Sequence, residues 1–301
     1  MHFLPLIAAI AAAFVIAPSA IAALAGAGVV RENYRGALVP SAAGLVIVVA
    51  AIVALAPLAA ADELADSEIL RSGVGAVLLY ALGVAFLGLV DDLLGGRAPA
   101  GAGPNPDAPR GWRGHAGAAA RGQLSTGALK AIGSLGLALY VLSGRDQSWV
   151  EYLLAVAVLL LATNLFNLLD LRPGRAIKVL VALAFALTLF AWDVVPLETL
   201  GLLFGPVLVL APYDLRERAM LGDAGSNLVG AIAGFWLVMA LSTAGQAVAL
   251  VVLIAITVYA EFRSLSALVE RNPLLRRLDC WGRLSSPADS HHGMPAGGTD
   301  G

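Results

Sequence analysis

Long apolar segments recur along this chain of 301 residues, and they limit what it can fold into. A helix needs about 17–25 mostly apolar residues to cross the hydrocarbon core of a bilayer. Only 13% of the residues are charged, whereas soluble proteins carry about 25%. We therefore predict an all-α, polytopic membrane protein with about nine transmembrane helices. The candidate segments are 3–27, 42–61, 74–90, 124–143, 150–168, 176–192, 197–212, 225–243 and 246–262.

The basic residues divide unequally between the two sets of alternating loops that these helices create. One set, together with Lys130, holds 17 of the 19 basic residues, and the other holds only Arg71 and Arg145. Because Lys and Arg are enriched in cytoplasmic loops, we place the N-terminus outside and the C-terminus in the cytoplasm. The first segment lacks the basic start of a signal peptide and is too long for one, so we expect it to be retained as a spanning helix.

The expected organisation is one transmembrane helical domain over residues 1–262 and a cytoplasmic tail over 263–301. The tail starts with the amphipathic stretch SLSALVERNPLLRRL and ends in residues whose composition predicts disorder. The net charge of −2 gives no indication of nucleic-acid binding. The single cysteine, Cys280, excludes an intrachain disulfide and a metal site built from several cysteines.

Two adjacent carboxylates, Asp91 and Asp92, stand where the third apolar segment ends. They either mark the boundary between hydrocarbon and water or hold something positive. Adjacent helical residues point about 100° apart, so the two carboxylates do not readily bind one ion together. Since the C-terminal end of a helix disfavours negative charge, we expect a basic side chain or a metal ion to compensate them.

A polar stripe closes the fifth apolar segment, which ends in TNLFNLLDLRPGRA. Asn164, Asn167 and Asp170 are spaced by three residues, which keeps them near one face of a helix. Polar residues at membrane depth usually turn toward the protein interior, so we expect this stripe to do the same. The two amides either hydrogen-bond between helices or line a site.

A tight turn follows the stripe, because Pro173 disfavours helix at the preceding residue and Gly174 permits the reversal. The turn presents Arg172 and Arg175 next to the carboxylate of Asp170. The two guanidiniums either follow the enrichment of basic residues in cytoplasmic loops or bind phosphate oxygens.

Further polar residues lie at the cytoplasmic ends of other segments. Asp223, within GDAGSN before the eighth segment, either caps a helix or belongs to a site at a helix N-terminus that accepts an anion. Lys130, one turn inside the fourth segment, either extends its charge to water or lies opposite the carboxylates. On their own, His291 and His292 in the polar tail are expected to be solvated.

In this order, the motifs resemble those of one family. DD ends one helix, NLFNLLD ends a later one, GDAGS opens another, and a histidine pair follows in the last cytoplasmic segment. Over residues 28–293 this arrangement is similar to that of the polyprenyl-phosphate sugar-1-phosphate transferases. This superfamily includes phospho-N-acetylmuramoyl-pentapeptide transferase and the undecaprenyl-phosphate N-acetylglucosamine-1-phosphate transferases.

The resemblance implies transfer of a sugar-1-phosphate from a UDP-sugar to a polyprenyl phosphate, with release of UMP, for cell-envelope glycan synthesis. It implies Mg²⁺ or Mn²⁺ as the cofactor and a multi-pass protein of the bacterial plasma membrane as the setting; a homodimer is compatible with it. By motif, it implies catalytic roles for Asp91, Asp92 and Asp170, metal ligation by Asp223 and Asn167, and substrate binding by Lys130, Asn164, Arg172, Arg175, His291 and His292.

One departure from the family pattern leaves a second function open. Relatives carry a second aspartate in the NLFNLLD motif region, where this chain has Pro173. The alternative is therefore a catalytically silent membrane scaffold or lipid-phosphate binder in envelope assembly. A transporter is less favoured, because apart from Lys130 the charged residues lie at helix ends rather than at mid-membrane. The transferase hypothesis requires the carboxyl groups of residues 91, 92, 170 and 223 to lie within reach of one divalent cation.

Overall fold

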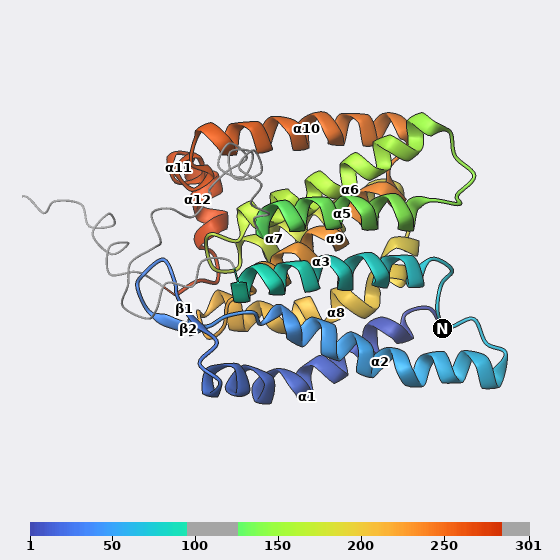
Figure 1. Cartoon of the computed structure of the whole chain (residues 1–301), viewed down its shortest axis with the longest axis horizontal. Coiled ribbons are helices and arrows are strands. Elements are labelled where there is room, and N and C mark those ends of the chain that lie inside the picture. Colours follow the sequence, from blue (N-terminus) through green and yellow to red (C-terminus); the bar gives the residue numbers. More distant parts are fainter. Residues whose placement is uncertain (95–125, 285–301) are drawn as a thin grey trace, which may run out of the picture.

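The computed structural model describes residues 1–94 and 126–284, which form a bundle of long helices with one small antiparallel sheet (Figure 1). Each predicted apolar segment is a helix in these ranges. Two shorter helices follow in the tail. The long helices are α1 (Leu4–Gly26), α2 (Gly44–Ala65), α3 (Val74–Leu94), α5 (Thr126–Leu142), α6 (Trp149–Leu169), α7 (Arg175–Ala191), α8 (Val195–Leu215), α9 (Gly222–Ala240) and α10 (Thr243–Phe262), and the tail helices are α11 (Leu265–Arg271) and α12 (Pro273–Cys280).

Seven helices within the described ranges are long and apolar enough to cross a membrane, namely α1, α2, α3, α6, α8, α9 and α10. The helices α5 and α7 are shorter, with 17 residues each. The helix α8 extends beyond the predicted segment at both ends and reaches 21 residues, because Pro196 fits the first turn of a helix. The prediction of a helical, polytopic membrane protein is confirmed at this level.

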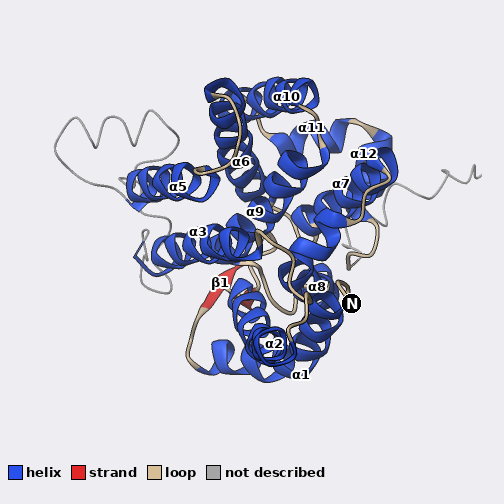
Figure 2. Cartoon of the chain, turned by 90° about the vertical axis from the view of Figure 1, so that its right-hand side faces the viewer, coloured by secondary structure: helices blue, strands red, loops and turns tan. Residues whose placement is uncertain are grey.

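The helix α9 forms the centre of the bundle (Figure 2). It packs against α2, α3, α6, α7 and α8, and nearly all of its residues from Ala224 to Val238 are buried. The helix α1 packs on α2 and α8, α5 packs on α3 and α6, and α10 packs mainly on α6. A buried α9 is possible because small residues alternate with large ones along it, so that neighbouring helices approach closely.

The loop after α1 contains the two strands, β1 (Val30–Glu32) and β2 (Leu38–Pro40), which departs from the all-α prediction. They pair antiparallel, with Arg31 opposite Val39. The side chain of Asn33 accepts hydrogen bonds from the backbone amides of Arg35 and Ala37, which stabilises the turn between the strands. The backbone of Pro40 also accepts from Met220, so the hairpin is fixed to the chain between α8 and α9.

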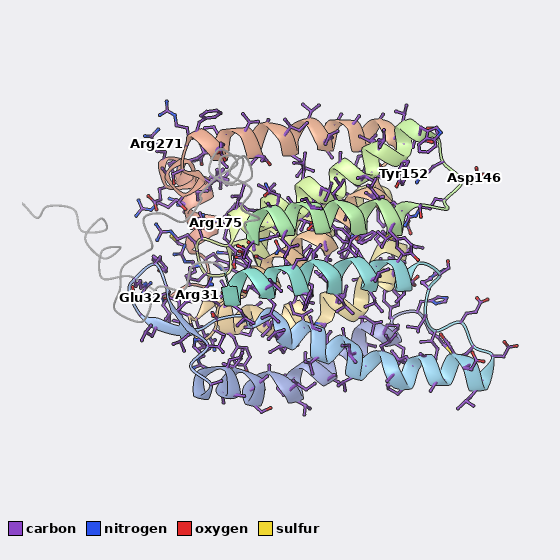
Figure 3. The ribbon with its side chains drawn as sticks, viewed as in Figure 1. Arg31, Glu32, Asp146, Tyr152, Arg175 and Arg271 are labelled. Atoms are coloured by element: carbon purple, nitrogen blue, oxygen red, sulfur yellow. The ribbon has the colours of Figure 1, made fainter. Side chains whose placement is uncertain are left out.

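The hairpin, the turn between α6 and α7, the chain between α8 and α9, and the tail helices all lie at one end of the bundle, which we call the basic end (Figure 1). Figure 3 shows Arg31, Arg175 and Arg271 at this end and Asp146 at the opposite end. The N-terminus also lies at the opposite end. The loops that the sequence assigned to one side of the membrane therefore share one end of the molecule.

Candidate active site

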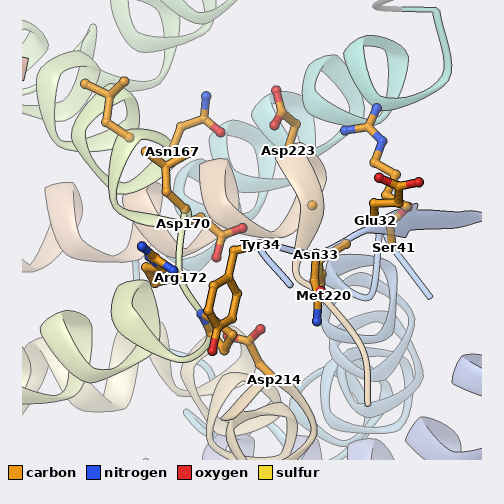
Figure 4. A pocket seen from close by; sticks show the side chains of 15 residues that line it. Glu32, Asn33, Tyr34, Ser41, Asn167, Asp170, Arg172, Asp214, Met220 and Asp223 are labelled. Carbon is orange, nitrogen blue, oxygen red and sulfur yellow. The ribbon is translucent and has the colours of Figure 1, made fainter. Parts of the chain in front are cut away.

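A cavity of about 520 Å³ opens at the basic end. Its walls come from the hairpin region, the C-terminal end of α6 with the turn that follows, the end of α8 and the start of α9 (Figure 4). Segments far apart in the sequence therefore contribute side chains to one space. The lining residues are Arg31, Glu32, Asn33, Tyr34, Ser41, Asn167, Leu168, Asp170, Leu171, Arg172, Pro173, Asp214, Met220, Gly222 and Asp223.

Two glycines allow α3 and α9 to meet beside the cavity. Gly222, the first residue of α9, has a φ of +68°, and a Cβ there would lie 2.8 Å from Oδ2 of Asp92. A Cβ on Gly88 of α3 would lie 2.4 Å from the carbonyl oxygen of Asp223. Side chains at these positions would therefore push the helices apart. The close approach brings the carboxylates at the end of α3 next to the start of α9.

Lys130 of α5 is the centre of a polar cluster beside the cavity. Its Nζ lies 3.0 Å from Oδ2 of Asp223 and 4.0 Å from Oδ2 of Asp91. The Asp91 and Asp223 carboxyl groups are also within hydrogen-bonding distance of each other. In the amide orientation that satisfies its neighbours, Asn167 accepts from Lys130 at 3.2 Å and donates to Ser226 and Asp223. Four helices thus place two carboxylates, an amide and an ammonium group together.

Asp92 has separate partners, as the 100° step between adjacent helical residues predicts. It is buried, its Oδ1 lies 3.1 Å from Nη1 of Arg31, and its Oδ2 accepts a hydrogen bond from the backbone amide of Ala224. Arg31 also donates to the carbonyl oxygen of Asp92. The compensating charges that the sequence led us to expect are therefore Lys130 for Asp91 and Arg31 for Asp92.

A second acidic pair lines the cavity below this cluster, formed by Asp170 at the end of α6 and Asp214 in the last turn of α8 (Figure 4). Asp214 is buried and accepts a hydrogen bond of 2.8 Å from the amide of Gly174. Burial and the nearby charges of Asp214 and Asp223 raise the pKa of the Asp170 carboxyl well above its usual value. The raised pKa shows that ionisation of Asp170 is disfavoured by burial and by its neighbouring carboxylates, and a bound cation would offset this cost.

The four motif carboxylates do not converge on a single point, so the requirement that all four lie within reach of one divalent cation is not met, and only a form of the hypothesis with fewer carboxylate ligands is compatible with the structure. The described part of the chain contains no group of three or more His, Cys, Asp and Glu side chains arranged to hold a metal ion. Mg²⁺, however, needs only one or two carboxylates, because it keeps waters and takes substrate phosphate oxygens. Asp223 and Asn167 satisfy that smaller requirement. The ammonium of Lys130 lies where their oxygens meet, so this position favours a cation.

The two arginines of the turn after α6 have different surroundings. Arg172 lines the cavity, where its Nη2 lies 3.0 Å from Glu270 of α11 and its guanidinium lies 4.5 Å from the ring centre of Tyr34. Arg175 is buried and does not line the cavity, because Asp279 of α12 binds its guanidinium. The expected role of Arg175 in substrate binding therefore gains no support from its surroundings.

Asn164 also lies outside the site. Its side chain is exposed, and it is not among the residues that line the cavity. The expectation that Asn164, Asn167 and Asp170 all face the interior is therefore correct for the last two only, because two steps of 300° still spread the three residues over an arc of about 120°. The alternative that Asp223 caps its helix is not seen either, since Leu221 holds the N-cap position. His291 and His292 lie outside the described residues.

Sequence reasoning missed Tyr34 and Asp214. The guanidiniums of Arg35, Arg172 and Arg283 lie 4.5–5.2 Å from the ring centre of Tyr34, which forms part of the cavity wall. No local pattern indicates that grouping. Asp214 did carry a signal, because it ends an apolar segment on the same side as Asp91 and Asp170.

Comparisons with known proteins add no assignment: no family model matches the chain, and no curated protein matches it. The functional argument accordingly depends on the geometry of the site.

Proposed function

We propose that this protein transfers a sugar-1-phosphate from a UDP-sugar to a polyprenyl phosphate, giving a lipid-diphospho-sugar and UMP. The observation that carries the proposal is the convergence of Asp91, Asp223, Asn167 and Lys130 from α3, α9, α6 and α5 beside one acidic cavity. Clusters of this kind, with carboxylates, an amide oxygen and a cationic side chain, suit a metal-bound diphosphate.

The proposed setting is the cytoplasmic face of the bacterial plasma membrane. In this proposal all nine long helices cross the bilayer, the N-terminus is outside and the basic end faces the cytoplasm, in accordance with the enrichment of Arg and Lys in cytoplasmic loops. The cavity then opens at the membrane surface. A lipid phosphate can reach it from the bilayer and a nucleotide sugar can reach it from the cytoplasm.

The proposed reaction is a phosphoryl transfer. An oxygen of the lipid phosphate forms a bond to the β-phosphorus of the UDP-sugar, the bond between that phosphorus and the bridging oxygen breaks, and UMP leaves with the electron pair. Such reactions depend on positioning and on stabilisation of charge rather than on covalent chemistry by the protein. Mg²⁺ or Mn²⁺, when bound, supplies positive charge that offsets the phosphates.

Each residue of the cluster has a role in this proposal. Asp223 and Asn167 would hold the metal ion, while Asp91 orients Lys130 for binding to phosphate oxygens. Asp170 lines the cavity beside this cluster, and Arg172 offers a guanidinium fork to the donor phosphates. Arg31 neutralises Asp92, whose main role is to hold the start of α9 in place. The assignment of Asp92 to catalysis is thus replaced by a positioning role.

The experiment is UMP release by the purified protein in detergent, given polyprenyl phosphate, Mg²⁺ and a panel of UDP-sugars. We expect release with at least one donor and none after Asp223→Ala. The matched control is Asp146→Ala, which removes an exposed carboxylate at the opposite end and should leave the rate unchanged. Failure of every donor, while a known transferase works in the same assay, contradicts the proposal.

Two observations favour the second candidate, a silent scaffold or lipid-phosphate binder. No three-carboxylate group exists in the described ranges, and Pro173 occupies the cavity wall where relatives carry an aspartate. Isothermal titration separates the two functions. A scaffold binds lipid phosphate without Mg²⁺-dependent binding of a UDP-sugar, whereas the transferase binds both.

A further inference from the structure

The tail helices lie at the surface of the basic end. Two residues separate the helix α11 from the end of α10, a helix apolar enough to cross the membrane. The helix α12 runs across the direction of the long helices and lies at the periphery beside α7 (Figures 1 and 2). A helix that follows a membrane span and turns across it lies at the depth of the lipid headgroups.

One side of α12 is fixed to the bundle. Asp279 binds Arg175 of α7 through two contacts, at 2.8 and 3.1 Å, and Arg283 through one at 2.7 Å. Lys178 of α7 donates to the carbonyl oxygens of Leu278, Asp279 and Trp281 at the C-terminal end of α12. These contacts determine which face of α12 turns toward the protein.

A different face of α12 is apolar and exposed. Leu274, Leu278 and Trp281 are spaced by four and three residues, so they share one face of the helix. Their exposed fractions are 65%, 57% and 76%. This face is turned by about 100° from that of Asp279, which follows Leu278 directly in the helix. Within residues 1–94 and 126–284, no segment covers this face.

Basic residues occupy the more polar side of the tail helices: Arg277 lies next to the apolar face, whereas Arg276, two residues after Leu274, points about 200° away from it. Arg271 at the end of α11 and Arg276 and Arg277 of α12 are exposed. Leu and Trp on one face with Arg beside them are typical of a helix that lies in the membrane interface. Trp favours the headgroup level, and juxtamembrane Arg residues are attracted to anionic lipids. Both the position and the charge of α12 fit a lipid surface.

We propose that α12, together with Arg271, binds the anionic phospholipid surface of the membrane that the chain spans. The inference does not rest on the transferase function, because no residue that carries it lines the cavity. It does connect to the cavity, since Glu270, next to Arg271, binds Arg172 in the cavity wall. Lipid contact at α12 thereby stabilises one wall of the site.

The test uses the single native cysteine, Cys280, which is exposed. A nitroxide is attached either to Cys280 or, in a Cys280→Ser background, to Leu278→Cys. Each full-length protein is placed in bilayer discs of phosphatidylcholine alone or mixed with phosphatidylglycerol. Accessibility to oxygen, which enriches in hydrocarbon, and to a water-soluble nickel complex then reports the depth of each label.

We expect the label at residue 278 to be accessible to oxygen and protected from nickel, and the label at 280 to show the reverse. The double substitution Arg276→Gln with Arg277→Gln should lower the affinity of α12 for the bilayer by about fivefold per charge removed, in anionic discs only. The control Arg145→Gln, at the opposite end, should change nothing. Three outcomes would overturn the proposal. They are access of nickel to the label at 278 in both lipids, an equal effect of the substitutions in neutral discs, and shielding of the label from both reagents by a protein partner.

Discussion

Arg175 should stabilise the tail rather than bind substrate. Its guanidinium contacts Asp279 at 2.8 and 3.1 Å and Ser266 at 3.0 Å. The change Arg175→Met keeps most of the apolar stem and removes the charge. We expect it to release α12 from α7 while leaving the side chains of the cavity in place.

The magnitude follows from the burial of the ion pair. The side chains of Arg175 and Asp279 are only 5% and 10% exposed, so solvent screens their interaction weakly. Breaking a buried pair by removing one partner costs about 3–5 kcal/mol. Because Arg283 still compensates Asp279, we expect the lower end of that range, and each 1.4 kcal/mol is about tenfold in an equilibrium. Local opening of α12 should therefore become at least about 10²-fold more frequent.

Hydrogen exchange of the α12 amides measures this opening. The matched control is Arg172→Met, three residues earlier in the chain, whose partner Glu270 is 58% exposed on its side chain. Exposed pairs contribute about 0–1 kcal/mol, so this change should accelerate exchange by less than about fivefold. Unchanged exchange in α12 after Arg175→Met would refute the reasoning, as would an effect no larger than that of Arg172→Met.

The remaining predictions concern the cluster, the start of α9 and the tail. Lys130→Met should lower the rate of UMP release by about 10²–10³-fold, the usual effect of losing a donor to a charged transition state. Lys130→Arg should retain more activity. Equal rates for the two variants would contradict the role of Lys130 in phosphate binding. Gly222→Ala should lower the thermal midpoint in detergent, because its φ of +68° and the 2.8 Å approach to Asp92 leave no room for a Cβ; the control Gly136→Ala, with open space around it, should not. Burial raises the pKa of Asp279, but its hydrogen bonds and ion pairs with arginines outweigh this and lower the pKa below its usual value. Protection of the α12 amides from hydrogen exchange should therefore hold above a pH of about 4 and decline below it. A decline already near neutral pH would contradict this.

The sequence was sufficient to predict the helices, because each apolar segment is long and the polar loops between them are distinct. It also predicted that Asp91, Asn167 and Asp223 come together with Lys130. This could be predicted because all of these residues stand at or near helix ends that the sequence assigns to the basic end.

The role of Arg175 could not be predicted, because it depends on a contact with Asp279, 104 residues later in the chain. Its own sequence context suggests a loop arginine at the membrane surface. Only the docking of α12 on α7 explains why this guanidinium is buried. The same reason applies to Tyr34, whose surroundings come from three separate segments.

The expectation of one ion shared by four carboxylates failed for a local reason. Asp92 follows Asp91 directly, so its side chain points toward Arg31 and the start of α9. Asp170 ends α6 one turn after Asn167 and lies closer to Asp214. Motif spacing identifies residues at the same end of the bundle, but helix rotation decides which of them face each other.

The central claim is that the cluster of Asp223 and Asn167 holds a divalent cation with a diphosphate. Binding of Mn²⁺ in the presence of UDP tests this claim directly, and it is measured as the loss of the free-ion signal in electron paramagnetic resonance. The account predicts one ion bound per chain, dependent on UDP and lost after Asp223→Ala but not after Asp146→Ala. Equal Mn²⁺ binding by the Asp223→Ala variant, or no binding by the unchanged protein, would contradict it.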